Sequence, residues 1–191
     1  MRFITYFPLL FFLLIACQRT TYIDDLGDKS FVLINQDSVK VTFPDDYEGK
    51  YVVMGFIYTN CPDICPLVTK NMKEIQEQLN IPDDVHFLGV SFDPKRDTPS
   101  VLKKYQEVWG VDKNFDFITG DSIVVAEMMD SLRVRTQVSF TTTTEAGEEI
   151  YFLNHSDKMM VMNPQAKLII EYGGSQPSVP RLIVEDLQAI R

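Results

Sequence analysis

The sequence is poor in side chains that bind metals or perform redox chemistry, with three cysteines and two histidines among its 191 residues. Positive charge is also in deficit, because 18 lysines and arginines face 27 acidic residues and leave a net charge of −9. This balance argues against binding to nucleic acid or anionic lipid and favours a partner with a basic surface. The N-terminal apolar stretch ends at Ala16 and is too short for a comfortable membrane span. With no internal repeat or low-complexity segment, the length suits one folded domain behind a short leader.

Cys61 and Cys65 stand four residues apart, between a strand pattern and a helix pattern. Residues 51–58 form an apolar, β-branched run without alternation, as expected for a strand buried on both faces. Apolar residues then recur at helical spacing from Leu67 to Leu79, and Pro66 suits a first helical turn. A helix N-terminus favours thiolates, which bind Cu(I) or Zn²⁺ or close into a disulfide. The pair predicts a reactive or metal-binding site, with a structural disulfide or two buried thiols as the alternative.

A metal site needs a third ligand besides two thiolates, and the candidates are His86 and His155. His86 lies near the start of a second buried-strand pattern, residues 85–91, where a satisfied edge or core histidine is more typical. His155 occupies a polar break between two strand-like runs, so we expect a loop histidine that is free to swing toward the cysteines. Met159 offers a nearby thioether, but core packing is the expected role of the methionines, and none is assigned as a ligand.

Three motifs in this order resemble the Sco/SenC family: CPDICP after the apolar strand, DPKRDTP at Asp93–Pro99, and NHSDKMMVMNP around His155. That family assists assembly of the copper centre of cytochrome c oxidase. The resemblance implies a thioredoxin-like fold, and it implies that Cys61, Cys65 and His155 are copper ligands, for Cu(I) and for Cu(II) as a second form. The family motif alone also indicates that Asp93 or Asp97 is a neighbour that tunes the cysteine site, with capping of the following helix as the alternative role.

The N-terminal segment, residues 1–16, has one basic residue followed by an apolar stretch of signal-peptide length. Leu14-Ile15-Ala16-Cys17 has the small-residue pattern of a bacterial lipoprotein cleavage site, so Cys17 is expected to be the lipidated first residue of the mature chain. An uncleaved anchor with an incidental Cys17 is the alternative. Either way, we expect export, with residues 17–29 as a tether and the domain on the periplasmic or extracytoplasmic side of the cell membrane, where the cysteines meet an oxidising compartment.

The remaining patterns predict an α/β domain over residues 30–191. A hairpin over residues 30–43 precedes the central strand, and residues 133–149 resemble an inserted hairpin or loop before the final strands. The other predicted helices run from Pro99, with a Thr98 or Asp97 cap, to an end at Trp109-Gly110, from Asp121 or Ser122 to Leu132, and from Pro177 onward. Strands are predicted at 115–119, 159–163 and 167–172.

Two functions fit these features. The first is a membrane-anchored copper metallochaperone, without covalent turnover, that hands copper to the copper-bearing subunit of cytochrome c oxidase or to another copper protein. The second is a thiol–disulfide oxidoreductase that reduces the acceptor's cysteines before metal transfer, although its CxxxC spacing departs from the CxxC of thioredoxins. A peroxidase of the peroxiredoxin type is disfavoured, because the position three residues before each cysteine holds Tyr58 or Pro62 instead of threonine or serine. We expect a monomer.

Overall fold

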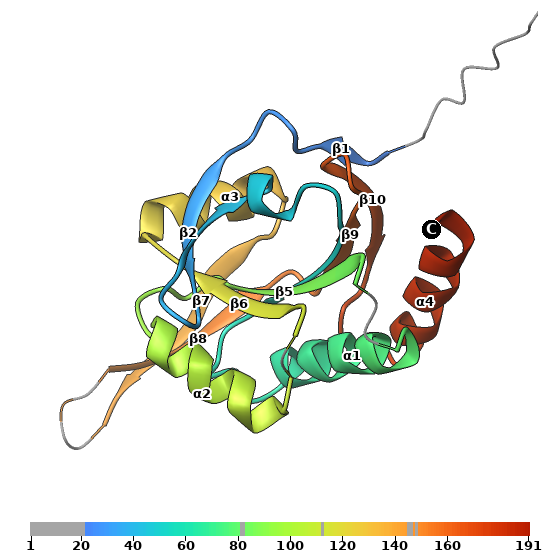
Figure 1. The fold of residues 1–191 in the computed structure, drawn as a ribbon. Coiled ribbons are helices and arrows are strands. Elements are labelled where there is room, and N and C mark those ends of the chain that lie inside the picture. Colours follow the sequence, from blue (N-terminus) through green and yellow to red (C-terminus); the bar gives the residue numbers. More distant parts are fainter. Residues whose placement is uncertain (1–21, 81–82, 112, 145–146, 148) are drawn as a thin grey trace, which may run out of the picture.

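The computed structural model describes residues 22–191 except 81–82, 112, 145–146 and 148. Within these ranges an eight-stranded sheet has the order β1-β10-β9-β4-β5-β6-β2-β3 (Figure 1). Its strands are β1 (Asp24–Asp25), β2 (Phe31–Asn35), β3 (Lys40–Phe43), β4 (Tyr51–Ile57), β5 (Val85–Ser91), β6 (Phe115–Thr119), β9 (Met159–Met162) and β10 (Lys167–Tyr172). The helices are η1 (Asp45–Tyr47), α1 (Ile64–Gln78), α2 (Pro99–Trp109), α3 (Ser122–Ser131) and α4 (Val179–Ile190).

The central strand predicted from the apolar run is confirmed as β4, which pairs in parallel with β5 and antiparallel with β9. All residues of β4 after Tyr51 are buried, as are all four residues of β9. β5 also pairs in parallel with β6, so three neighbouring parallel strands end at the same edge of the sheet. The methionines of β9 are therefore part of the hydrophobic core, as expected.

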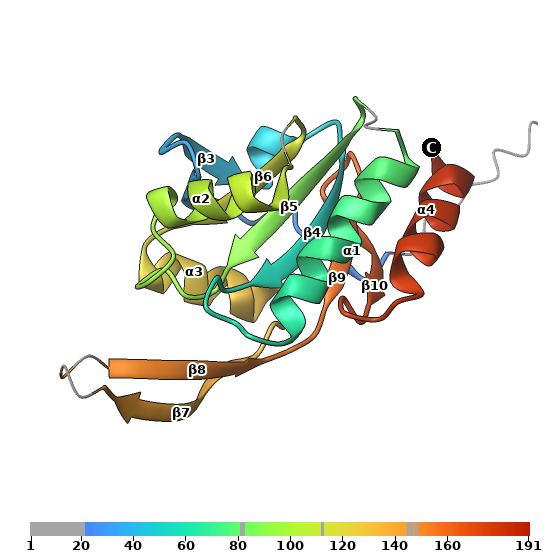
Figure 2. The same ribbon diagram turned by 90° about the horizontal axis from the view of Figure 1, so that it is seen from below.

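Helices α1, α2 and α4 lie on one face of the sheet and α3 lies on the other, as Figures 1 and 2 show together. α1 packs closely on β4 at Gly55, where a Cβ atom would lie only 2.4 Å from the Met72 sulfur and 2.7 Å from a methyl carbon of Val68. α2 ends at Gly110, which adopts the left-handed conformation with φ 61°, and the side chain of Asp121 caps α3 by accepting from Ile123 N. Both helix boundaries agree with the sequence prediction.

Part of the expected tether belongs to the folded domain. Residues Asp24–Asp25 form β1 against β10, and Leu26 is buried with 1% of its surface exposed. Leu26 is an apolar residue in a polar stretch of sequence without periodicity, so the sequence pattern did not predict its burial. The signal segment 1–16 and Cys17 lie outside the described residues. In the part of the chain that the structure describes, no helix has the length and apolar character needed to cross a membrane.

The insertion expected near residues 133–149 is a hairpin, formed by β7 (Thr136–Thr143) and β8 (Glu149–His155). It forms a separate two-stranded sheet that projects from the body of the molecule (Figure 2). Every residue of β7 is exposed, and the pairing contains an irregularity between Val138 and Phe140. The hairpin extends further than predicted, because β8 continues to His155.

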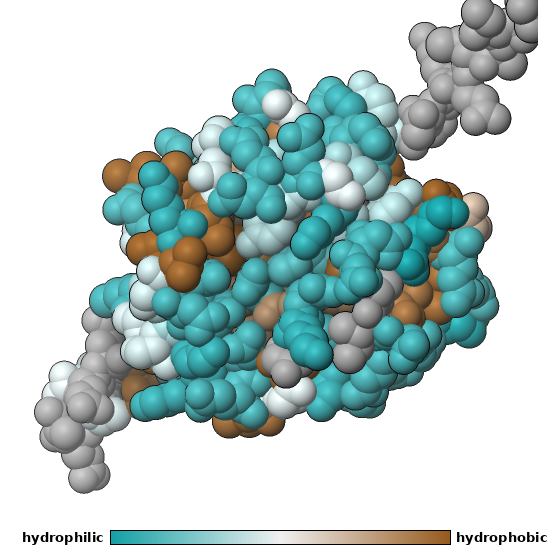
Figure 3. All heavy atoms as spheres, in the orientation of Figure 1, coloured by the Kyte–Doolittle hydropathy of each residue, from teal (hydrophilic) through white to brown (hydrophobic). Residues whose placement is uncertain are grey.

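The face of the molecule seen in Figure 3 is mostly hydrophilic, in keeping with the net charge of −9. Hydrophobic atoms gather on it at the side where α3 lies in Figure 1. Val32 and Ile34 of β2 and Ile123 of α3 are among the exposed apolar residues of these elements. β5 and β6 separate β2 from β4 in the sheet order, so Val32 and Ile34 have no place in the site described next.

Candidate metal centre

The cysteine pair lies where β4 ends and α1 begins, as the sequence predicted. Cys61 is in the connecting loop with 9% of its surface exposed, and Cys65 is the second residue of α1 and fully buried. The backbone N–H of Tyr58 donates to Cys65 Sγ over 3.4 Å. Both cysteines are free thiols in the structure, so they are not joined as a structural disulfide. The helix N-terminus and the Tyr58 N–H both favour negative charge on sulfur.

The sulfurs of Cys61 and Cys65 lie within 4.8 Å of each other, and their interaction shifts their two pKa values in opposite directions. A hydrogen bond from the Cys65 thiol holds the pKa of Cys61 well below its usual range despite partial burial. The same hydrogen bond and burial raise the pKa of Cys65 far above its usual value. The accessible sulfur is therefore a thiolate at neutral pH, while the buried sulfur keeps its proton until a metal ion or a base removes it.

His155 is the last residue of β8, paired with Thr136, and its Nε2 lies 3.4 Å from Cys65 Sγ. Its Nδ1 lies 3.0 Å from the carbonyl oxygen of Ser156. A carbonyl only accepts, so this hydrogen bond places the proton on Nδ1 and leaves the lone pair of Nε2 facing the sulfur. Metal-binding histidines in proteins are commonly oriented in this way.

The expectation of a swinging loop histidine is wrong for this structure. The His155 ring packs on Phe92, with ring centroids 4.7 Å apart, and presents its edge to Tyr58 at 6.2 Å. These aromatic neighbours follow β4 and β5, which are distant from His155 in the sequence. The pattern of residues 151–158 alone therefore could not predict these contacts. The histidine is thus held in place by packing, by strand pairing and by its Nδ1 hydrogen bond.

The ligand atoms of Cys61, Cys65 and His155 all lie within 4.8 Å of one another. Within the described ranges, this is the one group of at least three histidine, cysteine or carboxylate side chains placed to share a metal ion. His86 is not part of it: its Nε2 bonds Asp116 over 2.9 Å, and its ring packs on Tyr47. Of the two candidate histidines, the structure therefore brings only His155 to the cysteines.

Asp97 supports the loop that carries Cys61. Its fully buried carboxylate accepts from Thr59 N at 3.0 Å, from Thr59 Oγ1 at 2.5 Å and from Ser91 Oγ at 2.6 Å. Burial raises the pKa of Asp97 despite these hydrogen bonds. Thr98 is the N-cap of α2 and Pro99 begins the helix, as predicted, but the Thr98 side chain makes no cap hydrogen bond. The family motif alone had indicated that Asp97 lies near the cysteines.

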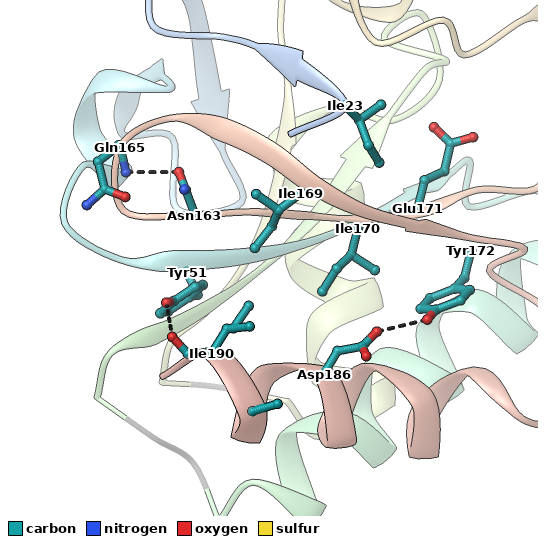
Figure 4. Close-up of a pocket in the computed structure, with 11 residues that line it drawn as sticks. Ile23, Tyr51, Asn163, Gln165, Ile169, Ile170, Glu171, Tyr172, Asp186 and Ile190 are labelled. Atoms are coloured by element: carbon teal, nitrogen blue, oxygen red, sulfur yellow. Dashed lines mark hydrogen bonds between the residues drawn. The ribbon is translucent and has the colours of Figure 1, made fainter. Parts of the chain in front are cut away.

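A cavity of about 290 Å³ opens beside these three side chains, lined among others by Cys61, His155, Ser139 and Phe152. A larger cavity of about 650 Å³ lies elsewhere, between β10 and the end of α4 (Figure 4). Its lining contains neither cysteine nor histidine, and its acidic groups already have partners: Tyr172 donates to Asp186 over 2.8 Å. We therefore place the candidate site in the smaller cavity, where the reactive groups converge.

Comparison with known proteins identifies the family. A family model described as SCO1/SenC matches residues 20–190. The chain belongs to the SCO1/SenC family. Its relative in Bacillus subtilis, described as a SCO1 protein homolog, is 26% identical over 185 residues, which cover 95% of this chain and 92% of that protein.

Solved structures of the SCO1/SenC family have the same fold. Copper-bound ScoI of Arabidopsis thaliana superposes with a TM-score of 0.67 at 26% identity, covering 84% of this chain and 97% of that one. BsSco, described as a member of the Sco family of cytochrome c oxidase assembly proteins with a disulfide switch, has a TM-score of 0.68 at 25% identity, covering 90% and 96%. The thioredoxin-like fold predicted from the motifs is confirmed.

Proposed function

We propose that this protein of the SCO1/SenC family is a copper metallochaperone. It holds copper between Cys61, Cys65 and His155 and delivers it to the copper-bearing subunit of cytochrome c oxidase or to another copper protein. The observation that carries the proposal is the grouping of two sulfurs and one imidazole nitrogen within 4.8 Å, at the edge of a solvent-accessible cavity. The copper-bound state of the related Arabidopsis ScoI supports copper as the metal.

The donor set suits copper in both oxidation states. Two thiolates are soft ligands that favour Cu(I), whereas an imidazole also suits Cu(II). With both thiols deprotonated, Cu(I) leaves a net charge of −1 on the site, which the N-terminus of α1 stabilises. The lone pair of His155 Nε2 is available because the Ser156 carbonyl holds the proton on Nδ1. Because Cys61 lines the cavity and Cys65 does not, an acceptor's ligand reaches the ion from the cavity side, and transfer proceeds by ligand exchange.

A second candidate function is reduction of a disulfide in the acceptor protein. It is favoured by the asymmetry of the pair, an accessible Cys61 thiolate beside a buried, protonated Cys65. The Cys61 thiolate attacks one sulfur of the acceptor disulfide, and the other sulfur leaves as a thiolate. The Cys65 thiol loses its proton and attacks Cys61, which releases the acceptor's second thiolate. The pair is oxidised by two electrons, and the acceptor thiolates take up the Cys65 proton and one from solvent.

The membrane anchor is part of the proposal. Residues 1–16 would direct export, Cys17 would carry the lipid, and the few residues before β1 would set the reach of the domain outside the cytoplasm. The packing of β1 and Leu26 against the domain shortens this reach, because residues from Asp24 onward belong to the folded domain and not to the tether. A domain so close to its anchor would meet acceptors that are themselves in the membrane.

Copper titration tests the function directly. A soluble form that begins at Gln18 keeps β1 and removes Cys17, so the only thiols left are those of the site. We expect one Cu(I) and one Cu(II) per chain against competing chelators, and loss of both in Cys61→Ser and Cys65→Ser. The matched control, His86→Ala, should bind as wild type. If no tight stoichiometric binding occurs while the dithiol still reduces a model disulfide, the chaperone proposal is wrong and the reductase is left.

A further inference from the structure

The turn between β5 and α2, residues 93–98, contacts both halves of the metal centre. On one side, Asp97 holds Thr59, two residues before Cys61. On the other side, Arg96 holds Tyr151, four residues before His155. The thiol half of the centre comes from the β4–α1 junction, and the imidazole half comes from the projecting hairpin. One short turn therefore links two parts that are about 90 residues apart in the chain.

Arg96 is the centre of a closed set of contacts that we call the Arg96 clamp, formed with Asp93 and Tyr151. The Arg96 guanidinium donates to the Tyr151 carbonyl oxygen over 2.7 Å and lies 3.6 Å from the centre of the Tyr151 ring. Its Nε donates to Asp93, whose other carboxylate oxygen accepts from the Tyr151 hydroxyl over 2.7 Å. Asp93 is buried and the Arg96 side chain is 19% exposed, so solvent competes little with these bonds.

The hairpin depends on this clamp because it is attached to the body through β8. β7 is exposed in every residue and pairs with β8 alone among the described strands. The body contacts β8 through Arg96 at Tyr151 and through the Tyr58 hydroxyl, which accepts from Leu153 N over 3.3 Å. It also contacts the end of β8, where the His155 ring packs on Phe92 and Tyr58. A two-stranded sheet by itself is marginally stable, so such contacts decide its angle to the body.

The distance between Tyr151 and His155 makes the angle of β8 important. Four residues of strand span about 13 Å, so a shift of β8 at Tyr151 is carried along the same strand to His155. Metal–ligand bonds tolerate deviations of only about 0.2 Å. A loosening of the clamp that shifts β8 would therefore lengthen the bond from His155 Nε2 to the metal, although Phe92 and Tyr58 still pack on the ring. The two sulfurs, held by Asp97 and α1, would stay in place.

We propose that Arg96 is a positioning residue for His155: by clamping Tyr151 it holds Nε2 at ligating distance from the cysteines and so sets the affinity for Cu(II) relative to Cu(I). This inference rests on the proposed copper function. The clamp touches neither sulfur nor the imidazole, and it acts on the one ligand that distinguishes the two oxidation states.

The test compares Arg96→Ala with the exposed control Arg181→Ala, whose side chain bonds Glu185 on α4. We expect Arg96→Ala to lose Cu(II) affinity by about 10–100-fold, the usual effect of removing a group that orients a metal ligand. Cu(I) affinity should change less than about threefold, and the Cu(II) EPR spectrum should lose its nitrogen coupling. Millimolar guanidinium should restore both, since it can refill the space between Asp93 and Tyr151. Tyr151→Phe keeps the ring and the carbonyl, so it should have a smaller effect and serves if Arg96→Ala folds poorly.

A double-mutant cycle separates positioning from general damage. Arg96→Ala should cause no further loss of Cu(II) affinity when His155 is already alanine, because both changes remove the same ligand. If the losses of Cu(II) affinity in the two single variants multiply in the double variant, the proposal is overturned. Equal losses of Cu(I) and Cu(II) affinity in Arg96→Ala would also overturn it. Hydrogen exchange in copper-free protein tests the clamp independently: in Arg96→Ala, amides 150–154 should exchange faster while β5 is unchanged. If wild type binds no copper, the proposed function fails, and this exchange result alone still supports or refutes the clamp.

Discussion

Replacement of His155 by alanine separates the metal centre from the dithiol chemistry. The change removes one of three donor atoms and leaves both sulfurs, the N-terminus of α1 and the Tyr58 N–H in place. Cu(II), which favours imidazole, should be lost first, and Cu(I) should remain bound by two thiolates with lower affinity. The Cys61–Cys65 disulfide should still form, because its geometry depends on the start of α1 and not on β8.

The size of the effect follows from the contacts of the ring. Removing an inner ligand should exceed the loss caused by an orienting group, so we expect Cu(II) affinity to fall at least about 100-fold, or about 3 kcal/mol. The ring also packs on Phe92 at 4.7 Å and on Tyr58 at 6.2 Å. Each aromatic contact contributes about 0.5–1.5 kcal/mol, so copper-free His155→Ala should be less stable by about 1–3 kcal/mol.

The assay measures both copper affinities under competing chelators, the disulfide reduction potential, and the urea unfolding midpoint, beside His86→Ala. The control loses a histidine that bonds Asp116 and packs on Tyr47, so it should lose stability without losing copper. Acceptor metallation should fail in His155→Ala despite residual Cu(I). Unchanged Cu(II) affinity in His155→Ala, or an equal loss in His86→Ala, would refute the assignment of the third ligand.

Three further predictions concern the membrane anchor, the loop that carries Cys61, and the stability of the fold at low pH. Cys17→Ala should release the protein from membranes or block its processing without changing copper affinity, as fractionation and titration would show; a processed, firmly bound variant would contradict the lipid anchor. Asp97→Ala removes three hydrogen bonds at about 1 kcal/mol each, so it should lower the free energy of unfolding by about 3 kcal/mol. Asp97→Asn should have a much smaller effect in the same denaturation assay. An equal loss of stability in both variants would show that the charge of Asp97 matters more than its hydrogen bonds. Burial opposes ionisation of Asp116, but hydrogen bonds from His86 and Gln36 outweigh burial and leave the pKa of Asp116 below the ordinary value of 3.8. The ionised Asp116 therefore stabilises the fold above pH 3.8, and this contribution is lost as the pH falls through the lower pKa of the folded state. Asp116→Asn should therefore flatten the stability profile below about pH 4 in acid titrations monitored by circular dichroism, and an unchanged profile would contradict this.

Most of the fold could be predicted because its elements carry strong local patterns. The buried run that became β4, the helical spacing of α1, and the helix end at Gly110 are each encoded within a few residues. β1 was missed, since a two-residue strand has no periodicity, and its pairing with β10 joins segments more than 140 residues apart. Long-range pairing of this kind leaves no local trace in the chain.

The candidate ligands were also predictable, but their arrangement was not. Thiol and imidazole side chains are scarce in this sequence, so their identity and the CxxxC spacing alone reduced the possible metal ligands to Cys61, Cys65 and one of two histidines. Motif resemblance then favoured His155. Whether that histidine swings or is held depends on Phe92, Tyr58 and the Arg96 clamp, which come from other elements.

The sequence by itself thus determined which atoms can bind the metal and which elements carry them, because residue chemistry and periodicity are local properties. Only the tertiary structure decided that Asp97 supports the thiol loop, that Arg96 secures β8, and that His86 is turned toward Asp116. Those roles depend on distances between strands and turns that meet only after the sheet has formed. A metal centre requires its donor atoms to be placed within tenths of an ångström, and that placement is a property of packing.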